Sequence, residues 1–70
     1  MTLYGVIIHG VYPRQLATVS ESKAYAEATK TKIINKLSHL SGLITVQKVD
    51  SFYPAGFADA DTNIHKAMEA

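Results

Sequence analysis

Hydrophobic and polar positions repeat with a helical period over residues 20–42. With about 100° of rotation per residue, one stripe collects the apolar side chains of this segment, namely Ala26, Ile33, Ile34, Leu37 and Leu40, with Thr29 beside them. The opposite side carries small or polar residues, namely Ala24, Ala28, Thr31 and Asn35. Ser20 can cap the helix at its N-terminus, and Gly42 can end it. The pattern therefore predicts one long helix over residues 20–42, against which the rest of the chain must pack.

The first strand is predicted over residues 2–12, where β-branched and aromatic side chains dominate. Both of its faces are largely apolar, with Leu3, Ile7 and Val11 on one and Tyr4, Val6, Ile8 and Tyr12 on the other. A strand covered on one face only would alternate more cleanly between apolar and polar residues. We therefore expect this strand either to be central and covered on both faces or to meet another chain. Because one helix covers only one face, the pattern favours a homodimer.

Two further strands and a short helix complete the predicted fold. Residues 15–19 follow the turn at Pro13 and should pair antiparallel with the first strand, because the connection between them is short. Residues 43–53 form the third strand, which we expect beside the first, with a bulge or the end of the strand near Lys48. Towards the C-terminus, Asp61 or Thr62 can cap a short helix.

These elements predict an α+β fold with a three-stranded, mainly antiparallel sheet in the order strand, strand, helix, strand. The long helix covers one face of the sheet. The acidic tail at residues 58–70, with its short helix, docks on the open face, reaches a neighbouring chain or is frayed as a chain terminus. A length of 70 residues allows only one domain, so residues 1–70 are expected to form a single unit.

The composition narrows the class of protein. The chain contains no cysteine, which excludes disulfides and thiolate zinc sites. Hydrophobic residues make up 47% of the chain, which is ordinary for a folded domain. No apolar run approaches the roughly 18 residues of a membrane span, and the N-terminus lacks the positive leader and cleavage site of a signal peptide. We therefore expect the protein in the cytoplasm, of its own cell or of a host.

The charges suggest one functional alternative. Positive residues outnumber acidic ones over residues 1–48, whereas acidic residues prevail over residues 49–70. Helical spacing predicts a basic flank beside the apolar stripe, made of Tyr25, Lys32, Lys36 and His39. Such a flank could neutralise a few phosphates and stack a base, so nucleic-acid binding is the alternative reading. The pI of about 8.0 and the acidic tail oppose it.

Candidate chemistry is sparse, and we expect neither an enzyme nor a cofactor nor a metal. Residues 59–63 copy the start of a calcium loop, but Ile64 and Ala70 stand where its glycine and glutamate belong. Asp61, His65 and Glu69 would share one ridge of a helix, as charged helix faces commonly do. The remaining histidines, His9 and His39, are dispersed, and no nucleophile motif or phosphate-binding loop occurs.

Protein contact is the function that the sequence favours. Aromatic side chains stand in or near the turns and strand ends, in a chain whose core is too small to use them all. Tyrosine and arginine are the usual anchors of protein interfaces. The predicted contact residues are Tyr12, Arg14, Tyr53 and Phe57. The sequence thus predicts a small non-enzymatic protein-binding or regulatory module that occupies a surface on a partner protein.

In the layout of its elements, the chain resembles small phage-encoded accessory proteins. The segments that carry the resemblance are YGVIIHGVY, QLATVSESKAYAEA and ITVQKV followed by FYPAGF, within about residues 3–57. Proteins of this kind include host-takeover inhibitors of RNA polymerase and some anti-CRISPR proteins, so the resemblance implies an inhibitor of a host protein. It contains no diagnostic motif and transfers no functional residue.

Overall fold

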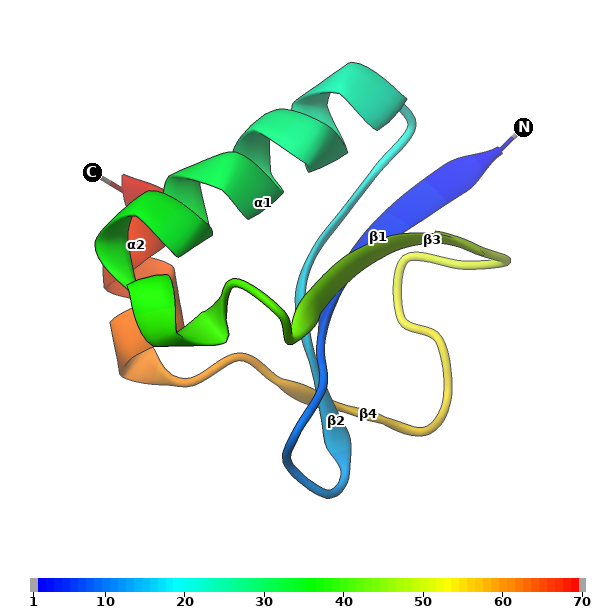
Figure 1. The fold of residues 1–70 in the computed structure, drawn as a ribbon. Helices are drawn as coiled ribbons and strands as arrows, with labels where there is room; N and C mark the ends of the chain where they lie inside the picture. Colours follow the sequence, from blue (N-terminus) through cyan, green and yellow to red (C-terminus); the bar gives the residue numbers. More distant parts are fainter. Residues whose placement is uncertain (1, 70) are drawn as a thin grey trace.

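The order of elements along the chain gives two α-helices and a four-stranded mixed sheet, an α+β fold as predicted (Figure 1). The computed structural model describes residues 2–69, so the two end residues of the predicted 1–70 domain lie outside the described part. The elements are β1 (Leu3–Ile8), β2 (Arg14–Ser20), α1 (Lys23–Lys36), the single 3₁₀ turn η1 (Ser38–Leu40), β3 (Ile44–Val49), β4 (Phe57–Asp59) and α2 (Thr62–Glu69).

The sheet has the strand order β3-β1-β2-β4. The apolar strand β1 is central and antiparallel to both β2 and β3, which confirms the placement of the third strand beside the first. The prediction of three strands is wrong, because β4 adds a fourth that runs parallel to β2. A three-residue strand is too short to show an alternating pattern, and β4 exists only through its pairing with residues 14–16.

The long helix is shorter than predicted at both ends. Its N-cap is Ser22, whose Oγ accepts a hydrogen bond from the Tyr25 amide at 3.1 Å. Ser20 is instead the last residue of β2 and pairs with Tyr4, which holds its backbone extended. At the other end α1 stops at Lys36, and the chain continues through η1 and a turn rather than as helix up to Gly42. This change of direction lets Leu37 and Leu40 pack against the core.

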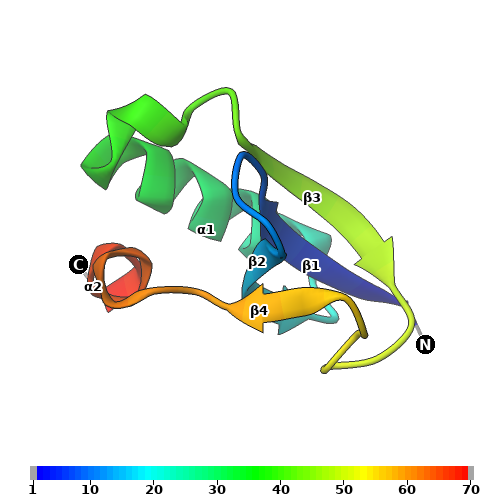
Figure 2. The ribbon, with the colours of Figure 1, turned by 90° about the horizontal axis from the view of Figure 1, so that it is seen from below.

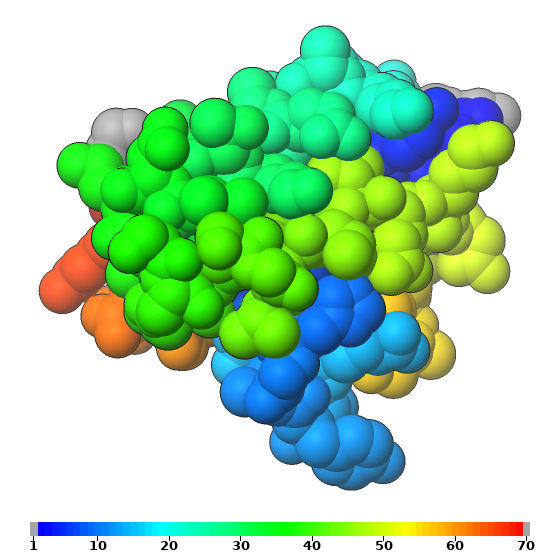
Figure 3. All heavy atoms as spheres, in the orientation of Figure 1, coloured from blue at the N-terminus to red at the C-terminus, as the bar shows by residue number. Residues whose placement is uncertain are grey.

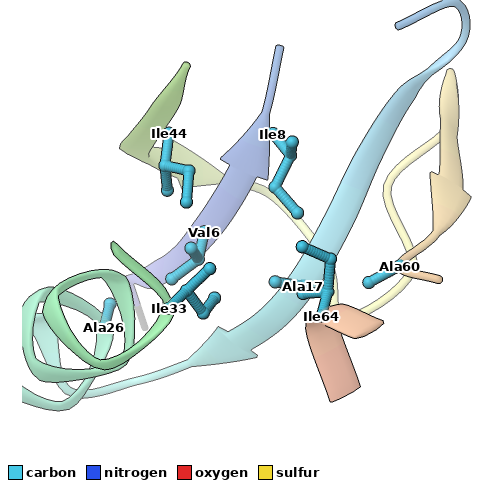
Figure 4. Packing of buried hydrophobic residues seen from close by; sticks show 8 residues of the cluster. All are labelled: Val6, Ile8, Ala17, Ala26, Ile33, Ile44, Ala60 and Ile64. Atoms are coloured by element: carbon cyan, nitrogen blue, oxygen red, sulfur yellow. The ribbon is translucent and has the colours of Figure 1, made fainter. Parts of the chain in front are cut away.

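The main core lies between the sheet and both helices (Figure 4). It is formed by buried residues from five elements and one connection, namely Val6, Ile8, Ala17, Ala26, Ile33, Ile44, Ala60 and Ile64. The predicted C-terminal helix is present as α2, and Asp61 caps it by accepting a hydrogen bond from the Ile64 amide at 3.0 Å. Through Ile64, α2 docks on the same side of the sheet as α1 and not on the opposite face.

The face of the sheet opposite the helices, here called the back face, also holds buried residues. Ile7 is fully buried and Leu3 is 5% exposed, although strand alternation points both away from the helix-side core. The side chains of Leu16 and Val49 close over Gly5, where a Cβ atom would lie 3.2 Å from a methyl carbon of each. A side chain at this position would therefore push the methyl groups of Leu16 and Val49 outwards by a few tenths of an ångström.

The connection between β3 and β4, residues 50–56, crosses the back face. β3 ends at Val49 opposite Leu3, whereas β4 begins at Phe57 beside Arg14, at the other end of the sheet and on its opposite edge. The segment must therefore return over the sheet (Figure 2), and Pro54 borders the hollow above Ile7. The second cover that β1 needs thus comes from the chain itself. The need for a second cover was the reason for which the pattern favours a dimer, and it no longer applies. The homodimer stays a prediction.

Candidate functional site

Two of the predicted contact residues, Arg14 and Phe57, meet in the structure. They are partners in the parallel pairing of β2 and β4, and the guanidinium carbon of Arg14 lies 5.0 Å from the centre of the Phe57 ring. This distance permits a cation–π interaction, which holds the arginine over the aromatic face. Two segments far apart in sequence therefore present an arginine and an aromatic ring at one end of the sheet.

Tyr12 and Tyr53 are the most exposed aromatic residues within residues 2–69, at 100% and 92%. Tyr12 lies in the β1–β2 connection, which projects from the body of the molecule (Figure 3), two residues before Arg14. Gly10 enables the start of that turn with a φ of +90°. Tyr53 lies on residues 50–56 and lines a hollow further along β2. The structure thus groups Tyr12 with Arg14 and Phe57, and places Tyr53 beside the middle of β2.

The hollow at Tyr53 contains residues that the sequence did not single out as contacts. It has a volume of about 240 Å³ and is lined by Leu16, Ala17, Thr18, Val19, Phe52, Tyr53, Asp59 and His65. Phe52 is 48% exposed, and its position next to Tyr53 was a usable signal in the sequence. Asp59 and His65 reach this place only because β4 and α2 return to β2, so no local pattern could have indicated them.

A second cavity, of about 310 Å³, lies at the end of the sheet where β1, η1 and the start of α2 meet. Its walls are largely apolar, and its polar groups belong to His9, Gln15, His39, Asp61 and Asn63. The Nε2 atom of His9 lies 2.8 Å from Thr45 Oγ1 and is engaged in that hydrogen bond. The fold therefore brings two dispersed histidines to one cavity, while His65 lies at the other hollow.

The predicted basic flank is divided in the structure. Tyr25, Lys32 and Lys36 are exposed on α1, but His39 belongs to η1, after the helix has ended, and lines the second cavity. The ammonium group of Lys32 donates a hydrogen bond to the carbonyl oxygen of Met68 at 3.1 Å. Lys32 is thus engaged at the C-terminal end of α2, where a positive charge is favourable.

We expect Lys32→Met to loosen α2 without unfolding the domain. Loss of a positive charge at a helix C-terminus costs about 0.3–1 kcal/mol, so the amide protons of α2 should exchange up to about fivefold faster. Hydrogen exchange followed by NMR measures this effect. Lys36→Met is the matched control, because Lys36 stands one turn further along α1 and should leave exchange in α2 unchanged. Equal exchange rates in the two variants would contradict the docking role of Lys32.

Neither helix within residues 2–69 is long and apolar enough to cross a membrane. The same part of the chain brings together no three side chains of histidine, cysteine, aspartate or glutamate that could hold a metal ion. No family model, no curated protein and no solved structure matches the chain. The resemblance in layout to phage-encoded proteins thus gains no support from these comparisons, and the site must be interpreted from its own chemistry.

Proposed function

We propose that the chain is a small non-enzymatic protein-binding or regulatory module, which acts by occupying a surface on a partner protein. The partner contact consists of Tyr12, Arg14, Tyr53 and Phe57. In the phage setting that its layout implies, the partner would be a host protein and the effect inhibition. The proposal concerns contact rather than chemistry, because it rests on exposed aromatic residues and an arginine and not on the polar groups that line the second cavity.

The observation that carries the proposal is the exposure of Tyr12 and Tyr53 in a domain that already buries a core on both faces of its sheet. An aromatic side chain contributes most when its large apolar surface leaves water, and these two rings contribute almost nothing to the fold in this way. Arg14 stands beside Tyr12 with its guanidinium over the Phe57 ring, so it is held in place before any partner arrives. Exposed tyrosine and pre-positioned arginine are typical of the residues that carry binding energy in interfaces.

The test is affinity capture with the double variant Tyr12→Ser/Tyr53→Ser. Wild type should capture a specific protein from a host lysate, and the double variant should bind that protein at least about tenfold more weakly once affinity is measured with the purified partner. Because both side chains are exposed, each change should alter the free energy of unfolding by no more than about 0.5 kcal/mol.

Tyr25→Ser is the matched control, since Tyr25 is also an exposed tyrosine, at 57%, but lies on α1 away from the proposed contact. It should bind the partner as wild type does. Unchanged binding by the double variant would refute the proposed contact residues. Loss of capture in Tyr25→Ser, or after nuclease treatment of the lysate, would favour nucleic-acid binding through Tyr25, Lys32, Lys36 and His39 instead.

A further inference from the structure

β4 pairs with only part of the outer edge of β2. β2 has seven residues, and β4 pairs with the first three of them, residues 14–16. The amide of Ala60 donates to the carbonyl of Leu16 at 3.2 Å, and the chain then turns into α2 and leaves the sheet. Within residues 2–69, no strand pairs with the outer edge of residues 17–20. We call this stretch, residues 17–20, the vacant edge.

The vacant edge borders a hollow whose other sides are formed by residues 50–56 and α2. This is the 240 Å³ hollow in which Phe52 and Tyr53 stand on the side of residues 50–56, and His65 stands on the side of α2. Open strand edges are commonly protected by charged residues, as Lys48 protects β3 at the opposite edge of the sheet. Residues 17–20 read Ala-Thr-Val-Ser and contain no charge and no proline, and the one irregularity is a shift of register at Ala17 in the pairing with β1.

We propose that an extended segment of the partner protein adds to the vacant edge as a further strand, end to end with β4. This inference rests on the proposed function and specifies how the partner is held. Unpaired backbone groups of an edge strand form hydrogen bonds with an added peptide regardless of its sequence, and pockets for alternate side chains supply the specificity. The lining of the hollow supplies side chains that can form such pockets.

The lining of the hollow determines which peptide fits it. Phe52, Leu16 and Val19 provide an apolar surface for side chains at every second position of the peptide. The lining includes Asp59 and His65 but no lysine or arginine. The preferred segment therefore alternates apolar and small polar residues and carries a lysine or arginine next to Asp59.

The same charges disfavour a second copy of this chain as the occupant. If two copies paired antiparallel about the middle of the vacant edge, Glu21 of each would come opposite Leu16 of the other, in the place that Asp59 of β4 already occupies. Two carboxylates would then compete for the same place at both ends of the new pairing, and like charges brought this close are destabilising. A basic peptide is attracted by the carboxylate of Asp59, whereas a second copy of the chain is repelled by it.

A synthetic peptide tests the proposal without any partner protein. The probe is blocked Arg-Thr-Val-Thr-Val-Thr-Arg, which places both arginines and both valines on one face in either strand direction. Its titration into the ¹⁵N-labelled chain should shift the amide signals of residues 17–20 and of Phe52 in a saturable manner. The same peptide with its central three residues N-methylated keeps the side chains but loses backbone donors, and should bind at least about tenfold more weakly.

Variants of the chain test the side-chain part of the proposal. Phe52→Ala should weaken binding of the probe about tenfold, as expected for the loss of an aromatic anchor. Asp59→Lys should reverse the preference, so that a probe with glutamate in place of both arginines binds more tightly than the arginine probe. Glu27→Lys is the control for net charge, since Glu27 is exposed on α1, and it should retain the preference for arginine.

The proposal is overturned by equal affinity of the N-methylated probe, by shifts confined to the β3 edge, or by an absence of saturable shifts at residues 17–20. Self-association of the free chain through residues 17–20 would overturn it in favour of a second copy. These outcomes are separate from failure of the proposed function, which is decided by Tyr12→Ser/Tyr53→Ser and the captured partner. A partner that needs Tyr12 but leaves the amides of residues 17–20 unchanged would retain the function and refute the added strand.

Discussion

Replacing Ile7 with aspartate should leave the purified chain unfolded at room temperature. Ile7 is fully buried on the back face, beneath residues 50–56 and between Leu16 and Thr45 on the neighbouring strands. A carboxylate there has no cationic partner in the lining of the hollow nearest to it except the exposed Lys48. Burying an unpaired charge should cost about 4 kcal/mol or more, whereas one core in a domain of this size rarely supplies more than about 3–5 kcal/mol.

Gln47→Asp is the matched control for Ile7→Asp. Gln47 pairs with Gly5 and therefore belongs to the same face of the sheet, but it is exposed. Its replacement should change the free energy of unfolding by no more than about 0.5 kcal/mol in urea unfolding followed by circular dichroism. If Ile7→Asp instead folded as a stable monomer, the back face would be open in the isolated chain. The apolar pattern of β1 would then need a second subunit after all.

Replacing Ile33 with alanine should have the second largest effect on stability. Ile33 is fully buried and is the residue of α1 that reaches the middle of the helix-side core (Figure 4). Truncation of a buried isoleucine to alanine costs about 2–5 kcal/mol, because transfer free energy is lost and a cavity remains. Since the whole domain is stabilised by a similar amount, a large part of the Ile33→Ala population should be unfolded without denaturant.

The control for Ile33→Ala lies two residues earlier on the same helix. Thr31 is exposed, and its hydroxyl donates a hydrogen bond to the backbone oxygen of Glu27 at 3.1 Å. Thr31→Ala removes this bond but improves helix propensity, so the midpoint of urea unfolding should hardly change. A small effect of Ile33→Ala, comparable to that of Thr31→Ala, would mean that α1 does not supply the main cover of the sheet.

Helical periodicity and the two-sided apolar strand were sufficient to predict most of the fold. Ala26, Thr29 and Ile33 are buried as their positions on the stripe required. β1 is central because apolar residues on both of its faces need cover. The end of α1 was less predictable, since Ser20 and Ser22 are both good capping residues and only the pairing of Ser20 with Tyr4 decides between them.

The fourth strand and the cover of the back face could not be predicted from local pattern. Both depend on the path of residues 50–56 across the sheet. A connection without helix or strand has no periodicity from which its path could be predicted. In the candidate site, too, some residues could be predicted from local pattern and others could not. Aromatic residues in or near turns marked Tyr12 and Tyr53, whereas Asp59 and His65 reach the hollow only because distant segments meet beside β2.

The position of residues 50–56 in the chain also determines the order in which the elements of the domain can pack together during synthesis. β1, β2, α1 and β3 precede this segment in the chain, so a ribosome releases them while β2 still lacks β4 and the core still lacks Ile64. The whole outer edge of β2 is then open to other nascent chains, and unpaired edges of this kind promote aggregation in folding intermediates. Rapid crossing by residues 50–56 would shorten the lifetime of that intermediate, so changes in this segment should affect the yield of folded protein as well as its final stability.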